Sequence, residues 1–141
     1  MIMFNCSGIY FHRKSFVYCW TQNFISRYVN VKKEMHTWNE QYKALDMHYR
    51  VIQGTSSLPP VVICHGMLGS HQNWSTIGKR IYKETNRSVY LPDMRNHGNS
   101  PHSNDMTYYD MASDVDLFIK KHNLDKVVLL GKSFFFLMEV N

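Results

Sequence analysis

The stretch VVICHGMLGS at residues 61–70 decides the fold, because a short apolar run passes directly into a loop with two glycines. The run Val61 to Cys64 is rich in β-branched residues, which predicts a strand buried on both faces. The glycines of the following loop allow a sharp turn that leaves backbone N–H groups unpaired. Such an N–H group can stabilise a developing oxyanion, although an ordinary strand-to-helix turn has the same composition.

Helical and strand patterns alternate on either side of this stretch. The spacing of apolar residues predicts one helix over residues 71–84 and another over residues 107–122. Short apolar runs predict further strands over residues 88–91 and 127–130, and residues 42–53 are compatible with a strand or a hairpin arm. This alternation predicts the α/β class, with a mostly parallel sheet that helices cover on both faces.

Functional groups in such a sheet gather in the loops beyond the carboxyl ends of the strands. One of these loops begins Gly131-Lys132-Ser133, directly after the last predicted strand. This arrangement is typical of a nucleophile elbow, a tight turn that presents a serine and needs small residues two places before and after it. Gly131 meets this requirement, and Phe135 does not.

The tripeptide Gly-Lys-Ser also ends a phosphate-binding loop. That motif requires a glycine at the position of Lys126 and a flexible loop after it. Residues 127–130 are predicted to form a strand instead, so no cradle of N–H groups can form. Nucleotide binding is therefore disfavoured.

The loop over residues 93–101 contains acidic, basic and imidazole groups. A metal site of His97, His102 and Asp105 is one interpretation, but the spacing matches no standard ligand set. We expect instead that these groups hydrogen-bond the backbone of their own loop. Four further histidines have no partner that the sequence identifies, and we interpret them as solvated or structural: His36, His48, His71 and His122.

The excess positive charge lies only at the start of the chain. Of the 141 residues 44% are hydrophobic and 19% are charged, which suits a packed core, and the formal net charge is +5. Residues 1–33 carry five basic residues and no acidic one, so the remainder balances 11 basic against 11 acidic residues. A nucleic-acid binder needs basic residues on its folded part, so we expect no nucleic acid as a partner.

The acid-free leader is similar in composition to a mitochondrial transit peptide. We therefore divide the chain into a leader over residues 1–40 and a domain over residues 41–141, and we expect a location in the mitochondrial matrix, with the cytoplasm as the alternative. No stretch approaches the roughly 20 apolar residues that span a bilayer. Three cysteines without a Cys-x-x-Cys pair favour neither a disulfide framework nor a zinc site.

The three loops, in this order and spacing, resemble the α/β-hydrolase superfamily. Their motifs are HGMLGS from residue 65, DMRNHGNSPHS from residue 93 and VVLLGKS from residue 127. More narrowly, the chain from about Tyr42 to Ser133 resembles the alpha/beta hydrolase domain-containing protein 11 family, a group of mitochondrial ester and lipid hydrolases. The resemblance implies the N-terminal half of an α/β-hydrolase domain.

The resemblance also implies a role for each matching residue. Ser133 would be the nucleophile that attacks an ester carbonyl, and the backbone N–H groups of Met67 and Phe134 would form the oxyanion hole. The residues that shape this hole and the pocket would be His65, Gly66 and His97. The implied substrates are carboxylic esters, including diacylglycerol-like lipids, and neither a metal nor an organic cofactor is implied. Nothing in the sequence indicates an oligomeric state.

Members of this family continue beyond the nucleophile with a helix and three more strands, which carry the acid and the histidine of the triad. The eight residues after Ser133 do not match the family, and Lys132 stands where a histidine is usual. We therefore expect a hydrolase domain truncated after the nucleophile strand, without the triad Asp and His and inactive by itself. The alternative, from another class, is a non-catalytic fragment that acts only by association with another protein.

Truncation has two further consequences. The strand over residues 127–130 should lie at an open sheet edge, apolar on both faces and prone to aggregation. A stand-in base would have to come from His65 or His97, and neither has an orienting carboxylate evident in the sequence, so we expect neither to act as one.

Overall fold

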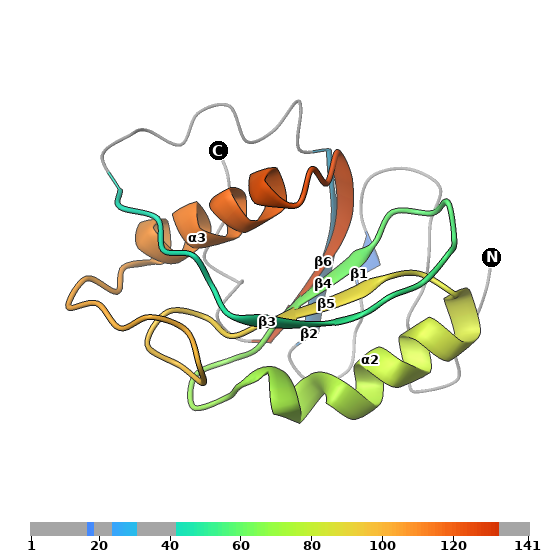
Figure 1. Ribbon diagram of the computed structural model, residues 1–141, viewed down its shortest axis with the longest axis horizontal. Helices are drawn as coiled ribbons and strands as arrows, with labels where there is room; N and C mark the ends of the chain where they lie inside the picture. Colours follow the sequence, from blue (N-terminus) through green and yellow to red (C-terminus); the bar gives the residue numbers. More distant parts are fainter. Residues whose placement is uncertain (1–16, 19–23, 31–41, 133–141) are drawn as a thin grey trace.

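The computed structural model describes residues 17–18, 24–30 and 42–132, with side chains over residues 42–131 (Figure 1). These residues form one sheet in the order β1-β2-β6-β4-β5-β3. The strands are β1 (Val17–Tyr18), β2 (Phe24–Asn30), β3 (Tyr49–Ile52), β4 (Val61–Cys64), β5 (Val89–Pro92) and β6 (Lys126–Lys132). The helices are α2 (His71–Thr85) and α3 (Tyr108–Lys121).

The centre of the sheet is parallel, since β4 pairs in parallel with β5 on one side and with β6 on the other. The flanking pairs are antiparallel: β3 with β5, β2 with β6, and β1 with β2. Figure 1 shows α3 on one face of the sheet and α2 on the other. The predicted fold class, an α/β sheet with helices on both faces, is confirmed.

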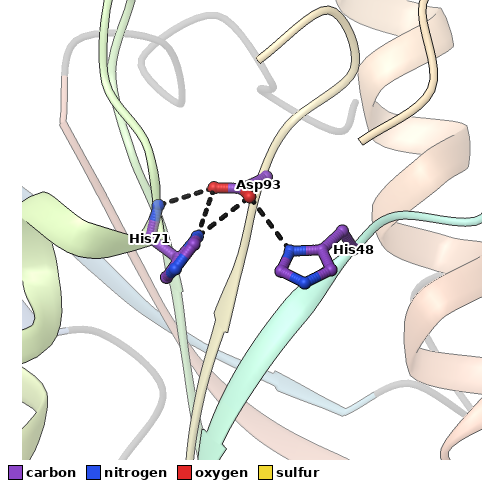
Figure 2. Close-up of side chains that lie close together, drawn as sticks. All are labelled: His48, His71 and Asp93. Atoms are coloured by element: carbon purple, nitrogen blue, oxygen red, sulfur yellow. Dashed lines mark hydrogen bonds and ion pairs between the residues drawn. The ribbon is translucent and has the colours of Figure 1, made fainter. Parts of the chain in front are cut away.

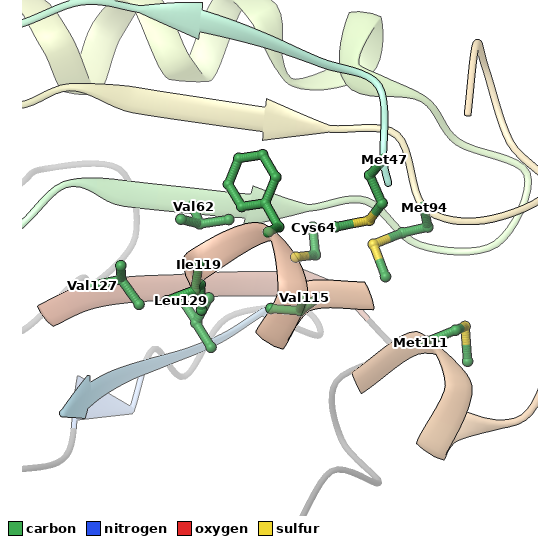
Figure 3. Close-up of a cluster of buried hydrophobic side chains, with 10 residues drawn as sticks. Met47, Val62, Cys64, Met94, Met111, Val115, Ile119, Val127 and Leu129 are labelled. Atoms are coloured by element: carbon green, nitrogen blue, oxygen red, sulfur yellow. The ribbon is translucent and has the colours of Figure 1, made fainter. Parts of the chain in front are cut away.

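Strand β4 contributes residues to both hydrophobic cores, because successive residues of a strand face opposite sides of the sheet. Val62 and Cys64 pack in the core beneath α3, together with Phe118 and Ile119 (Figure 3). Val61 and Ile63 pack in the other core, which contains Trp74 of α2. All four residues of β4 are buried, as an uninterrupted apolar run predicts.

The helices begin close to the predicted residues because side chains cap them. Ser70 caps α2 in a reciprocal capping box with Asn73, and Thr107 caps α3 in the same way with Asp110. Only Tyr49–Ile52 of the predicted arm over residues 42–53 forms a strand. None of the helices in the described part of the chain is long and apolar enough to cross a membrane.

The prediction of an open edge at β6 is wrong. Strand β2 pairs with β6 along its whole length, from Phe24 opposite Lys132 to Asn30 opposite Lys126. This partner comes from the stretch interpreted as a leader, far away in the sequence. The backbone groups on the outer side of β6 therefore face another strand.

Candidate active site

The loop after β4 is held in place by His65, whose side chain is buried. Its Nε2 accepts a hydrogen bond from the Met94 amide at 2.9 Å, so its Nδ1 carries the proton and donates to the Gly66 carbonyl at 2.8 Å. Burial lowers the pKa of this imidazole. Because both ring nitrogens are engaged, His65 ties the loops after β4 and β5 together and has no lone pair left for general-base catalysis.

The turn after His65 leaves Met67 at the surface. The Gly69 amide donates to the Gly66 carbonyl at 3.1 Å, and Leu68 adopts a left-handed conformation with φ of 61°. Met67 as a whole residue is 74% exposed. Among the residues that the structure describes, the Met67 amide has no hydrogen-bond acceptor. An oxyanion-hole donor must be available in this way, although the predicted roles of Met67 and Gly66 stay predictions.

The loop after β5 hydrogen-bonds itself, which confirms the structural interpretation of its polar residues. The Asn96 side chain donates to the Ser103 carbonyl at 2.9 Å and accepts from the Ser103 amide at 2.7 Å. Ser100 Oγ donates to the Asp93 carbonyl at 2.6 Å. Gly98 has a φ of 54°, and a Cβ there would lie 2.3 Å from the Asp93 carboxylate, so only glycine fits.

His97 is partly buried, and its ring meets the edge of His65 with 5.1 Å between centroids. Its Nδ1 pairs with the Arg95 carbonyl at 2.8 Å, which makes Nδ1 the donor and places the ring's lone pair on Nε2. No carboxylate orients this ring among the described contacts. The predicted pocket-lining role of His97 is compatible with this position and stays a prediction.

Asp93 joins two histidines that the sequence left without a partner (Figure 2). Its fully buried carboxylate accepts hydrogen bonds from His71 Nδ1 at 2.9 Å and from His48 Nδ1 at 3.1 Å. Burial alone would raise the pKa of Asp93, but hydrogen bonds from the amides of His71 and Asn99 and from both rings outweigh it and lower the pKa to about 2. Of the two interpretations of His48 and His71, solvated or structural, these contacts favour the structural one and identify the partner that the sequence did not.

Arg95 and Asp114 form a buried ion pair that sequence reasoning missed. Arg95 Nε lies 2.7 Å from one carboxylate oxygen of Asp114, and Nη2 lies 2.8 Å from the other. Arg95 also donates to the carbonyls of Lys43, Asp105 and Asp110. The pair therefore joins the loop after β5 to helix α3 and to the segment before β3.

Ser133 and Phe134, the predicted nucleophile and second oxyanion-hole donor, lie outside the described residues. The strand that leads to them is described, and Gly131 pairs with Cys64 in parallel register. Among the described residues, the group with metal-ligand spacing is His48, His71 and Asp93. This group does not include His97, His102 or Asp105, which are the candidate metal ligands considered from the sequence.

Comparisons with known proteins show a family model and several relatives that are similar to this chain. A family model described as alpha/beta hydrolase fold matches residues 59–134. The sn-1-specific diacylglycerol lipase ABHD11 of Xenopus tropicalis is 37% identical over 91 residues, which are 64% of this chain and 28% of that protein. Ethanol acetyltransferase 1 of Cyberlindnera fabianii is 36% identical over 74 residues, which are 52% of this chain and 22% of that protein.

Solved structures give the same result. A marine microorganism esterase is 44% identical and superimposes with a TM-score of 0.54, over 60% of this chain and 31% of that chain. The esterase from Exiguobacterium antarcticum is 26% identical, with a TM-score of 0.53 over 59% of this chain and 30% of that chain. The chain spans less than a third of the length of the curated relatives named above.

Proposed function

Because the chain belongs to the alpha/beta hydrolase fold family and resembles ABHD11 within it, we propose that its domain is the front half of a serine hydrolase that acts on carboxylic esters. In this proposal Ser133 is the nucleophile, and the amides of Met67 and Phe134 receive the oxyanion. Diacylglycerol-like lipid esters are the proposed substrates, by analogy with the lipase relatives. Ester hydrolysis and acetyl transfer to an alcohol share the step that matters here, attack of a nucleophile on an acyl carbonyl.

One observation carries this proposal: the parallel register in which Cys64 pairs with Gly131. Parallel strands end at the same edge of a sheet, so the residues that follow β4 and β6 leave that edge together. Met67 comes three residues after Cys64, and Ser133 comes two residues after Gly131. This register supports the placement of the Met67 amide and a serine hydroxyl on neighbouring loops, as acyl transfer requires.

The proposal assigns no general base to the loops after β4 and β5. His65 has both nitrogens engaged, whereas His97 keeps a lone pair on Nε2. Without an oriented base, a serine hydroxyl is a weak nucleophile. We therefore propose that efficient catalysis needs a histidine and an acid from outside residues 42–132.

The 141-residue chain is expected to react slowly with a fluorophosphonate probe, and Ser133→Ala should abolish the reaction. Loss of the serine–histidine unit lowers kcat by about 10⁶-fold in a protease that uses the same constellation. Labelling is measured by in-gel fluorescence or mass spectrometry, with His102→Gln as a control that should label like the parent chain. Labelling that persists in Ser133→Ala would contradict the assignment of the nucleophile.

Labelling of the His97→Gln variant with the same fluorophosphonate probe tests whether His97 acts as the base. Rapid labelling of the parent chain that is lost in His97→Gln would make His97 the base, contrary to the proposed role of residues outside 42–132. A chain that folds and never labels would favour the second candidate function, a non-catalytic module that acts by association. The structural observation in its favour is the absence of a carboxylate beside His97 in the described region.

We also propose, from its composition alone, that the leader directs the protein to mitochondria. A fluorescent reporter fused to residues 1–40 is expected to co-localise with a mitochondrial dye, because import requires a basic, amphipathic segment. The matched control replaces Arg13 and Lys14 with glutamate, which should disperse the signal. A diffuse cytosolic signal from the unchanged fusion would overturn the proposal and favour the cytoplasm.

A further inference from the structure

Three segments that are distant in sequence bring their polar side chains together at Asp93 (Figure 2). His48 lies just before β3, His71 begins α2, and Asp93 follows β5. One ligand atom from each residue, a ring nitrogen or a carboxylate oxygen, lies within 4.8 Å of the other two. Figure 2 shows the Asp93 carboxylate between the two rings, so the three potential ligand atoms lie in one small cluster.

Among residues 42–131, whose side chains the structure describes, no lysine or arginine pairs with the Asp93 carboxylate. Its described hydrogen bonds come from the amides of His71 and Asn99 and from the two imidazoles, all of which are neutral when the rings are unprotonated. The neighbouring cation, Arg95, is engaged with Asp114. Neutral donors hold this buried anion by hydrogen bonds, and a bound cation would add the counter-charge that they do not supply.

The chemical nature of the three ligand atoms indicates which metal ions the site would bind. Two imidazole nitrogens and one carboxylate oxygen are ligands of zinc and similar divalent metals, at bond lengths of about 2.0–2.2 Å. Tetrahedral bonds of that length separate the ligand atoms by roughly 3.4 Å. The observed separations between Asp93 Oδ2 and the Nδ1 atoms of His71 and His48 are 2.9 and 3.1 Å. The atoms of the whole group lie within 4.8 Å of one another, so an ion would fit if both rings moved away from the carboxylate and closer to each other.

The surrounding backbone holds the ligands in this arrangement. The Asp93 amide donates to the His48 carbonyl at 2.8 Å, and Ser100 Oγ accepts from the His48 amide at the same distance. The amide of His71 donates to the Asp93 carboxylate at 2.6 Å and orients it. The His48 side chain is 33% exposed, which leaves a path for the ion and for a water ligand.

We propose that His48, His71 and Asp93 form a binding site for a divalent transition-metal ion such as Zn²⁺, with water completing the coordination. On binding, the proton of each neutral ring moves from Nδ1 to Nε2. The metal ion then takes the place of the two Nδ1–H donors that hydrogen-bond the carboxylate in its absence. The site is independent of Ser133, so it can exist whether or not the chain hydrolyses esters. Binding stabilises the native state by RT ln(1 + c/Kd), where c is the free metal concentration, because the ligands lie on segments that separate on unfolding.

The test uses the full 141-residue chain after treatment with a chelator, with Co²⁺ as the spectroscopic probe and Zn²⁺ as the competitor. We expect visible d–d bands of four-coordinate Co²⁺ that saturate at one ion per chain and disappear when Zn²⁺ is added. His48→Gln is expected to weaken Co²⁺ binding by at least about 100-fold, a loss larger than outer-shell substitutions usually cause. His102→Gln, which changes an exposed histidine farther along the loop that contains Asp93, should bind Co²⁺ like the parent chain.

The partly exposed His48 is the informative position, because its substitution leaves the amide donors to Asp93 in place; circular dichroism confirms that each variant is folded. His71→Gln should reproduce the loss of binding where it folds. The proposal is overturned if the parent chain shows no four-coordinate Co²⁺ spectrum, or if His48→Gln binds as tightly as the parent. Equal weakening in His102→Gln would also overturn it, since the ion would then bind elsewhere.

Discussion

Removal of residues 1–40 is expected to expose one side of β6 to solvent while its other side stays paired. The Val128 amide donates to the Pro60 carbonyl at 2.9 Å, so Val128 directs its backbone groups toward β4. Adjacent residues of a strand direct these groups to opposite sides, so Val127 and Leu129 direct theirs toward β2. Hydrogen exchange at Val127 and Leu129 should become faster by at least about 100-fold after removal, whereas Val128 and Leu130 keep most of their protection.

The shortened chain should also aggregate at concentrations where the full chain stays monodisperse in light scattering. An unpaired apolar strand is a template for pairing with another chain, and β6 is the strand that loses its partner here. Unchanged protection at Leu129 would show that β2 does not pair with β6 in solution.

Two proline substitutions give a control that keeps the leader at full length. Val29 lies opposite Val127, so its N–H faces β6, whereas Tyr28 lies opposite Val128 and directs its N–H away from β6. Val29→Pro should therefore reproduce the faster exchange at Val127, and Tyr28→Pro should cause much less change, because a proline is tolerated where no ladder bond is lost. Similar effects of both substitutions would contradict the register.

The elements that sequence reasoning found are those with local causes. The β-branched run at β4 and the capping residues Ser70 and Thr107 act within a few residues, so the pattern alone locates them. The pairing of β2 with β6 has no local signal, because it joins segments from opposite ends of the chain. The grouping of His48 with Asp93 also has no local signal, because it depends on the pairing of β3 with β5.

The buried ion pair differs, because the sequence contained a signal for it. Met111, Val115 and Phe118 form an apolar stripe along α3, and Asp114 occupies the remaining position of the i, i+3, i+4, i+7 pattern. A carboxylate in such a stripe must be buried and must therefore have a partner. The stripe predicts that Asp114 is paired, but only the folded structure identifies Arg95 as the partner.

Asp114→Asn is expected to lower the free energy of unfolding by about 3 kcal/mol, because the buried Arg95 guanidinium loses its two short carboxylate contacts and keeps only Asp110, whose Oδ1 lies 3.6 Å from Nη1, as a counter-charge. Both side chains of the pair are at most 1% exposed, so water cannot replace the lost carboxylate. Asp114 also accepts from the Leu45 amide at 2.6 Å, so the variant loosens the segment before β3. Urea denaturation followed by circular dichroism measures the change.

The matched control is Glu84→Gln, which removes a carboxylate from the exposed pair that Glu84 forms with Arg80 one turn away in α2. This change should lower the free energy of unfolding by no more than about 0.5 kcal/mol, because solvent screens the pair. Adding Arg95→Met to Asp114→Asn should cost much less than Arg95→Met does alone, since the first substitution has already broken the pair. If the two substitutions are instead additive, or if Asp114→Asn is as mild as Glu84→Gln, then this ion pair does not hold the loop after β5 against α3.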